Sequence, residues 1–434
     1  MTMRDLRHRF SGMIRGSTLR GIAERSWKDP LYRNSLILTA SRFLNAAVIG
    51  FLFWTIAAHL YPVAEVGIGT ALISATGLLV SLAMLGFDVS VIRFTPLREP
   101  GEVFSISVWV TTAAAAVLGA GFLLVVPVVM PSLAIIRDYW LLFLAIVPLT
   151  SFIYILGRTF IAHRRPHLLF FQYLVTAVRL PLLYPLVFLG GLGIFLAAGV
   201  SSFLAAAFSL FVAMKFVRLT FGVRRDVLRD MYRFSSANYV STLLADIPEL
   251  VLPLIVLAVL GPVAAALYYI AFAIATLILV IPDALGTSYF VEGSYGSGDP
   301  RGEALRALLV SALVLLPIGI CVILFGKTLL QFFGTAYTEA YPLLVILTFS
   351  SFLVAFHKIG IPFLNIHMRI GAIIAINGLR LVLILGLAYF LLPVFGINGA
   401  GIAWILAHAI IAVPLIWLLG RPAAGIPAGT GEAA

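Results

Sequence analysis

Long apolar stretches, separated by short polar segments, recur from about residue 34 to residue 420. A helix that crosses the hydrocarbon core of a bilayer needs roughly 20 mainly apolar residues, and about twelve stretches reach that length. They cover roughly 34–60, 63–87, 103–130, 139–162, 168–190, 193–215, 236–260, 263–286, 304–326, 340–363, 371–394 and 396–420. The pattern predicts an all-α polytopic membrane protein.

Composition excludes the soluble classes. Hydrophobic residues make up 62% of the 434 residues and charged residues only 11%, whereas soluble domains have about 25% charged residues. The net charge is +11, but the basic residues lie in short segments between the apolar stretches. This distribution indicates membrane topology and not a nucleic-acid surface, so no nucleic-acid partner is expected.

Lys and Arg are divided unequally between the two sides that these crossings create. Positively charged loops are retained in the cytoplasm, so the richer side is predicted to be cytoplasmic. It contains a basic N-terminal arm (1–33), a connector (216–235) and the C-terminal tail (421–434), whereas the other side has only Arg137 and Lys327. Both termini are therefore predicted to be cytoplasmic.

An internal repeat emerges when the chain is compared with itself at an offset of 200 residues. Residues 60–86 match residues 260–286 without a gap at many positions, and Pro62 and Gly86 are among the residues matched. Six predicted helices lie on either side of the connector, so the two halves have the same orientation in the membrane. We expect two pseudo-symmetric six-helix bundles, 34–215 and 236–420, with transport at their interface.

Three arginines lie deep inside apolar stretches. At about 1.5 Å per residue from the predicted cytoplasmic ends, Arg42, Arg179 and Arg380 are roughly 12, 16 and 14 Å deep. A charge at such depth costs about 2.5–3.5 kcal/mol and needs a cavity or a partner. One interpretation is a cationic cavity for an anion such as pyrophosphate, held by bidentate guanidinium contacts. The alternative is that the arginines pair with carboxylates or backbone carbonyls as internal links.

An acidic pair, Asp246 and Glu249, lies one helical turn apart in the stretch 236–260. Polar residues at helical spacing in an apolar stretch are typical of a helix that lines a cavity. The carboxylates are candidates for binding H⁺ or Na⁺ during a transport cycle, or for neutralising the arginines. The further candidates for cavity lining, from the seventh and first stretches, are Asn238, Thr242 and Asn45.

Asp88 and Arg93, just beyond the second stretch, form a candidate cytoplasmic gate pair, with a solvated loop pair as the alternative. The sequence has no motif for nucleotide hydrolysis, zinc binding, a serine nucleophile or a dinucleotide. Its single cysteine, Cys321, leaves no disulfide. We therefore expect no enzyme activity, no cofactor and no metal, and any active transport to be driven by an ion or by the substrate.

Three segments resemble a known family. They are LYPVAEVGIGTALISATGLLVSLAMLGFDVSVIRF (residues 60–94), LFGKTLLQFFGTAYTEAYPLL and VFGINGAGIAW. The first is similar to the second-helix region, and the others to later helix junctions, of the polysaccharide-transport proteins. These are O-antigen (Wzx-type) flippases of the multidrug/oligosaccharidyl-lipid/polysaccharide (MOP) exporter superfamily. The resemblance extends over nearly all of residues 34–420.

This resemblance implies a two-lobed, MATE-like fold with an alternating-access cavity in the bacterial inner membrane. The implied function is a flippase or exporter of undecaprenyl-pyrophosphate-linked oligosaccharide for O-antigen, capsule or exopolysaccharide synthesis. Arg42, Arg179 and Arg380 would supply the cationic cavity. Membrane lipids would surround the protein, and a polysaccharide polymerase and glycosyltransferases are implied as partners.

Three rival functions stay open. A drug or cation antiporter of the same superfamily would have an acidic and aromatic cavity, whereas deep arginines favour an anionic substrate. A polysaccharide polymerase or ligase would carry its chemistry on a large periplasmic loop, and no loop predicted on that side exceeds roughly fifteen residues. The third is a purely structural membrane scaffold, and the deep charges count against it.

Overall fold

The computed structural model describes residues 30–220, 224–294 and 299–420. Most of the predicted N-terminal arm and the tail 421–434 lie outside these described residues. Within them the chain is helical, without strands, and eleven helices are long and apolar enough to cross a membrane. The predicted all-α membrane class is therefore confirmed.

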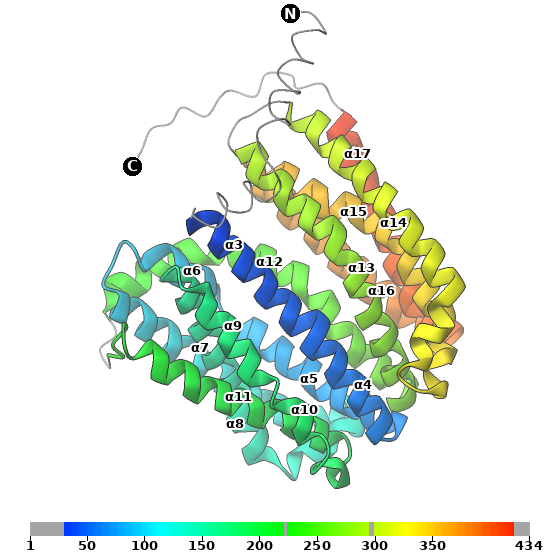
Figure 1. Cartoon of the computed structure of the whole chain (residues 1–434), viewed down its shortest axis with the longest axis horizontal. Coiled ribbons are helices and arrows are strands. Elements are labelled where there is room, and N and C mark those ends of the chain that lie inside the picture. The colour runs from blue at the N-terminus through cyan, green and yellow to red at the C-terminus, as the bar shows by residue number, and fades with distance from the viewer. Residues whose placement is uncertain (1–29, 221–223, 295–298, 421–434) are drawn as a thin grey trace, which may run out of the picture.

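The helices fall into two groups, which Figure 1 shows on either side of the molecule. The first comprises α3 (Pro30–Phe43), η1 (Leu44–Gly50), α4 (Phe51–Leu60), α5 (Val63–Ala83), α6 (Phe87–Phe94), α7 (Pro100–Val129), η2 (Pro131–Arg137), α8 (Trp140–Ala162), α9 (Pro166–Thr176), α10 (Arg179–Leu182), η3 (Val187–Leu189) and α11 (Gly191–Ala213). The second comprises α12 (Arg225–Leu260), α13 (Pro262–Ser294), α14 (Pro300–Gln331), η4 (Thr335–Ala340), α15 (Tyr341–Ile366), α16 (Ile370–Phe395) and α17 (Ile397–Gly420).

Equivalent helices make equivalent contacts in the two groups. The third span contacts the fourth, as α7 on α8 and α14 on α15, and the sixth contacts the fourth, as α11 on α8 and α17 on α15. The first span contacts the fifth, as α3 on α9 and α12 on α16. This repetition of contacts is what the internal sequence repeat predicts.

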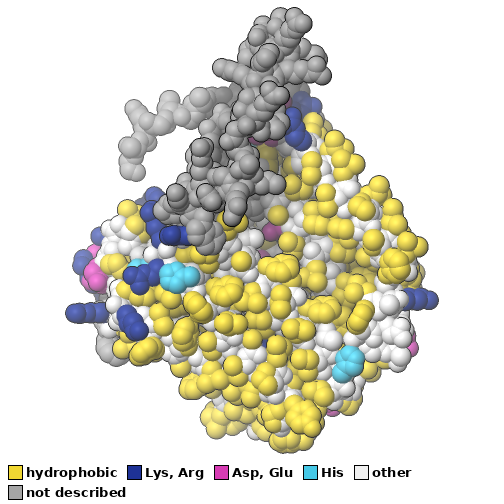
Figure 2. Space-filling model, viewed as in Figure 1, with side chains coloured by type: hydrophobic (Ala, Val, Ile, Leu, Met, Phe, Trp, Pro, Cys, Tyr) yellow, Lys and Arg dark blue, Asp and Glu magenta, His cyan; other side chains and the backbone are white. Residues whose placement is uncertain are grey.

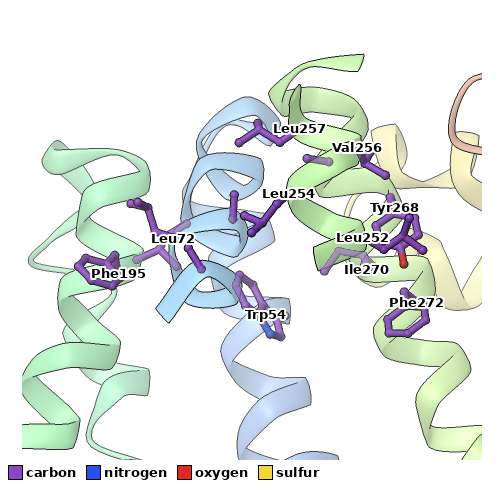
Figure 3. Packing of buried hydrophobic residues seen from close by; sticks show 14 of the residues in the cluster. Trp54, Leu72, Phe195, Leu252, Leu254, Val256, Leu257, Tyr268, Ile270 and Phe272 are labelled. Carbon is purple, nitrogen blue, oxygen red and sulfur yellow. The ribbon is translucent and has the colours of Figure 1, made fainter. Parts of the chain in front are cut away.

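The two groups meet where α5 contacts α12 and α13. Gly67 of α5 lies so close to α13 that a Cβ there would be 1.8 Å from the carbonyl oxygen of Pro262, so this position requires glycine. Figure 3 shows buried side chains continuing across this boundary, from Leu72 on α5 to Leu254 on α12 and Tyr268 on α13. One apolar core therefore joins both groups.

The fifth predicted stretch, 168–190, is not a continuous helix and is not among the eleven long helices. α9 ends at Thr176, and only the short α10 and η3 follow. Two prolines explain the break, because Pro181 and Pro185 have no N–H and the Pro181 ring clashes with the carbonyl of Ala177 in a regular helix. Irregular backbone at membrane depth is tolerated where it is buried in protein or lines a water-filled cavity.

Two other predicted boundaries are wrong. α12 begins at Arg225, so the second half of the predicted connector 216–235 is helix and not loop. α5 ends at Ala83, and Gly86, with a φ of +79°, turns the chain into the short helix α6. A left-handed turn of this kind favours glycine.

The surface carries large exposed apolar side chains, such as Leu124, Val128 and Phe188. Figure 2 shows hydrophobic side chains over most of one face, with Lys and Arg gathered towards its edges. A patch of this extent suits lipid and not water. The start of α3 and the end of α17 lie at the same end of the molecule (Figure 1), as the predicted even number of crossings requires.

Candidate functional site

The central pocket lies between the two groups of helices and has a volume of about 450 Å³. Arg179 of α10 lines it from the first group and Glu249 of α12 from the second. The aromatic residues lining it are Phe51, Phe53, Trp54, Tyr269, Phe272 and Phe333. One basic and one acidic side chain therefore share an otherwise mainly apolar pocket.

The N-half pocket, of about 460 Å³, lies among α3, η1, α8, α9, α10 and α11. Three arginines line it: Arg42, Arg158 and Arg179. No Asp or Glu is found among the described residues that line it. The predicted Asn45 is also there, on the π-helical segment η1, and such segments are frequent at functional sites.

The interface pocket, of about 400 Å³, lies among α5, α6, α8 and α12. It brings together Asp88, Thr242, Asp246 and Glu249, which the sequence analysis had proposed separately as gate and cavity residues, and adds Arg158. The side chain of the other proposed α12 residue, Asn238, lies outside the described residues.

The C-half pocket is smaller, about 180 Å³, and contains Glu249, Asp283, Lys358 and Arg380. Lys358 forms an ion pair with Asp283, with 2.8 Å between Nζ and Oδ1. This pocket is of mixed charge, whereas the N-half pocket is lined by basic residues alone among its charged groups. The two halves share a fold but differ in the polarity of their pockets.

Three charged residues stand where these pockets join. Glu249 lines the central, interface and C-half pockets, Arg179 lines the central and N-half pockets, and Arg158 lines the N-half and interface pockets. The pockets are therefore neighbouring parts of one region between the helices, joined at these charged side chains.

Arg179 is positioned by the break in the fifth span. Its guanidinium lies 4.9 Å from the ring centre of Phe53, and its buried Nε has no hydrogen-bond partner. The Tyr61 hydroxyl donates to the carbonyl of Leu183 at 2.7 Å, which satisfies one group of the irregular backbone. Burial raises the pKa of the Tyr61 hydroxyl to about 12. Because its Nε has no hydrogen-bond partner, the Arg179 guanidinium has a donor to offer to a ligand.

Arg380 differs from Arg179, although the two lie in similar short segments of the two halves, VRL around Arg179 and LRL around Arg380, at an offset of 201 residues. It lies within the continuous helix α16, is 3% exposed, and donates a hydrogen bond through Nη2 to the backbone carbonyl of Ala245 on α12. This contact matches the alternative in which the arginine is an internal link. Arg380 and Arg179 line different pockets, so the two do not converge on one site in this conformation.

The proposed gate pair needs correction. Asp88 pairs with Arg158 of α8, with 3.4 Å between Oδ2 and Nη2. Arg93 is exposed at the other end of α6 and forms no ion pair with Asp88. Residues five apart on a helix point about 140° away from each other, which explains why the neighbour in sequence is not the partner.

Arg158 is a functional candidate that the sequence analysis missed, because it lies near the cytoplasmic end of its predicted stretch, where basic residues are expected from topology alone. Its position inside the apolar stretch 139–162, four residues before α8 ends, was the available signal. Its Nη2 donates to the hydroxyl of Tyr154 at 2.5 Å, and its buried Nε has no partner. Asp283 was likewise found only by the structure.

Comparisons with known proteins place the fold. No family model matches the sequence, and no curated protein matches it. Among solved structures, an inward-facing multidrug resistance MATE family transporter of the MOP superfamily superposes with a TM-score of 0.71 at 15% identity, covering 90% of this chain and 99% of that one. The lipid II flippase MurJ, in an inward closed conformation, superposes with a TM-score of 0.73 at 11% identity, covering 89% of this chain and 88% of that one.

A MOP superfamily transporter from Pyrococcus furiosus, reported with a binding pocket of reverse polarity, gives a TM-score of 0.62 at 16% identity, covering 91% of this chain and 96% of that one. At these identities the likeness establishes the fold. The predicted fold class, two pseudo-symmetric helical bundles of MOP type, is confirmed. The narrower resemblance to O-antigen flippases stays a prediction.

Proposed function

We propose that this protein is a flippase or exporter that moves a lipid-linked oligosaccharide across the bacterial inner membrane by alternating access. The moving bodies are the segments 34–215 and 236–420, both termini are cytoplasmic, and the connector 216–235 links the halves on that side. Glycosyltransferases would supply the substrate and a polysaccharide polymerase would consume it. Undecaprenyl pyrophosphate is the carrier that the sequence resemblance implies.

The N-half pocket is the observation that carries this proposal. Arg42, Arg158 and Arg179 line one pocket without a carboxylate among the described lining residues. Guanidinium groups stay charged at any working pH and bind phosphate oxygens bidentately, so this pocket suits a pyrophosphate head group. The glycan would occupy the adjoining central pocket, and the lipid tail would remain in the bilayer. Arg380 serves to hold α16 against α12.

Accumulation of the lipid-linked oligosaccharide at the cytoplasmic face tests the proposal. In cells that depend on this protein, the double variant Arg42→Ala, Arg179→Ala is expected to reach the membrane in normal amounts, because removal of deep charges eases insertion. It should nevertheless block export. Normal export by this variant at a normal protein level would contradict the proposal.

The central pocket favours one second candidate, an ion-coupled drug or cation antiporter. Glu249 and the aromatic rings of Trp54 and Tyr269 could bind an organic cation. Ethidium efflux from cells overproducing the protein separates the two functions. Efflux that is lost in Glu249→Gln and unaffected in Arg42→Ala, Arg179→Ala would support the antiporter instead of the flippase.

A further inference from the structure

Asp88 holds Arg158 in a loose contact. The 3.4 Å ion pair uses the same Nη2 that hydrogen-bonds to Tyr154, and the side chains are 25% (Arg158) and 13% (Asp88) exposed. Nε of Arg158 is buried and has no hydrogen-bond partner. The guanidinium therefore has an unused hydrogen-bond donor. Its contact with Asp88 is also not the bidentate arrangement that makes an arginine–carboxylate pair strong.

Arg158 can reach two pockets from one backbone position. It lines the interface pocket, where Asp88 lies, and the N-half pocket, where Arg42 and Arg179 lie. A pyrophosphate in the N-half pocket carries more negative charge than one carboxylate and can take both arms of the guanidinium fork. It would compete with Asp88 for the same side chain.

The helix that carries Asp88 also ties the two halves of the protein together. Ser90 of α6 donates to the carbonyl of Met231 on α12 at 3.1 Å, and Ser235 of α12 donates to the carbonyl of Gly86 at 3.0 Å. A Cβ on Gly86 would lie 2.7 Å from that of Ser235, so the approach is close. Phe87 packs with Met231 in a small apolar cluster of its own. We call this the α6–α12 contact.

We propose that Asp88 occupies the substrate's place on Arg158, and that substrate phosphate displaces it. Loss of the Asp88–Arg158 pair removes an ion pair between α6 and α8, so that α6 can shift, which weakens the α6–α12 contact and lets the halves move. This inference rests on the proposed function and adds to it how binding of the anion starts the conformational change. Since no covalent bond changes, the exchange is one of ion pairs only.

Calorimetric titration of the full-length protein in lipid nanodiscs with geranyl pyrophosphate tests the exchange. Asp88→Asn keeps the shape of the side chain but removes the competing charge, and should tighten binding by about two- to fivefold, the range for a partly exposed ion pair. Asp226→Asn is the matched control. This residue is an exposed carboxylate paired with Arg224 at the start of α12, outside the pockets, and its loss should leave the affinity unchanged.

A disulfide test reports on the α6–α12 contact itself. In a Cys321→Ala background, the pair Ser90→Cys, Ser235→Cys should cross-link readily without ligand and more slowly with geranyl pyrophosphate. Adding Asp88→Asn should slow cross-linking even without ligand. Two results would contradict the proposed exchange while leaving the flippase proposal intact. They are equal or weaker binding of geranyl pyrophosphate by Asp88→Asn, or a cross-linking rate that geranyl pyrophosphate does not change. Absence of pyrophosphate binding by the unmodified protein would instead refute the proposed substrate.

Discussion

Arg179 and Glu249 line the same central pocket from opposite halves of the chain. Each also lines pockets that the other does not: Arg179 lines the N-half pocket, and Glu249 lines the interface and C-half pockets. A substrate or ion in the central pocket is therefore in reach of both charges. Substitutions of Arg179 and Glu249 can therefore test anion binding and ion coupling separately.

Two substitutions of Arg179 separate the contribution of its charge to anion binding from that of its planar geometry. Arg179→Lys keeps the positive charge but loses the planar fork, whereas Arg179→Gln loses both. Charged hydrogen bonds contribute about 1.5–3 kcal/mol, so the glutamine variant should bind geranyl pyrophosphate roughly 10- to 100-fold more weakly. The lysine variant should be intermediate. Equal affinity of all three proteins would show that Arg179 does not contact the anion.

Glu249 and Asp246 are expected to carry ion coupling. Glu249→Gln and Asp246→Asn remove a charge with little change of shape, so binding of H⁺ or Na⁺ should be lost while anion binding persists. Substrate flux in proteoliposomes under imposed pH or Na⁺ gradients measures this. Glu339→Gln, an exposed residue of η4 away from the four pockets, is the control. Flux that still responds to the gradient in both variants would assign coupling elsewhere.

Arg380 is expected to affect stability more than binding. Arg380→Ala removes a hydrogen bond from a charged donor to the backbone carbonyl of Ala245, and bonds of this kind contribute about 1.5–3 kcal/mol. Thermal unfolding in detergent should therefore occur at a lower temperature, with geranyl pyrophosphate affinity close to normal. A large loss of affinity at unchanged stability would return Arg380 to the substrate site.

Topology can be checked with an impermeant thiol reagent in a Cys321→Ala background. Asp226→Cys, in the predicted connector, should react only from the cytoplasm, and Thr335→Cys, in η4 on the side of Lys327, only from the periplasm. Both positions are exposed, so access to the reagent is not limited by burial. The reverse labelling pattern would invert the orientation and the direction of transport.

The sequence by itself determined the class of protein, because hydrophobicity over some 20 residues is a local property that needs no knowledge of neighbouring helices. It also indicated the repeat and the deep charges. Prolines 181 and 185 were visible, but whether they kink a helix or end it depends on what satisfies the freed backbone groups, here the hydroxyl of Tyr61.

Only the tertiary structure decided which charges share a pocket. Asp88 and Arg158 are 70 residues apart, and they meet because α6 packs against α8. Arg179 and Arg380 match in the repeat, yet one lies at a break and the other in a continuous helix, so they face different pockets. The rotation of each helix about its axis is set by packing with its neighbours, and no pattern within one stretch specifies it.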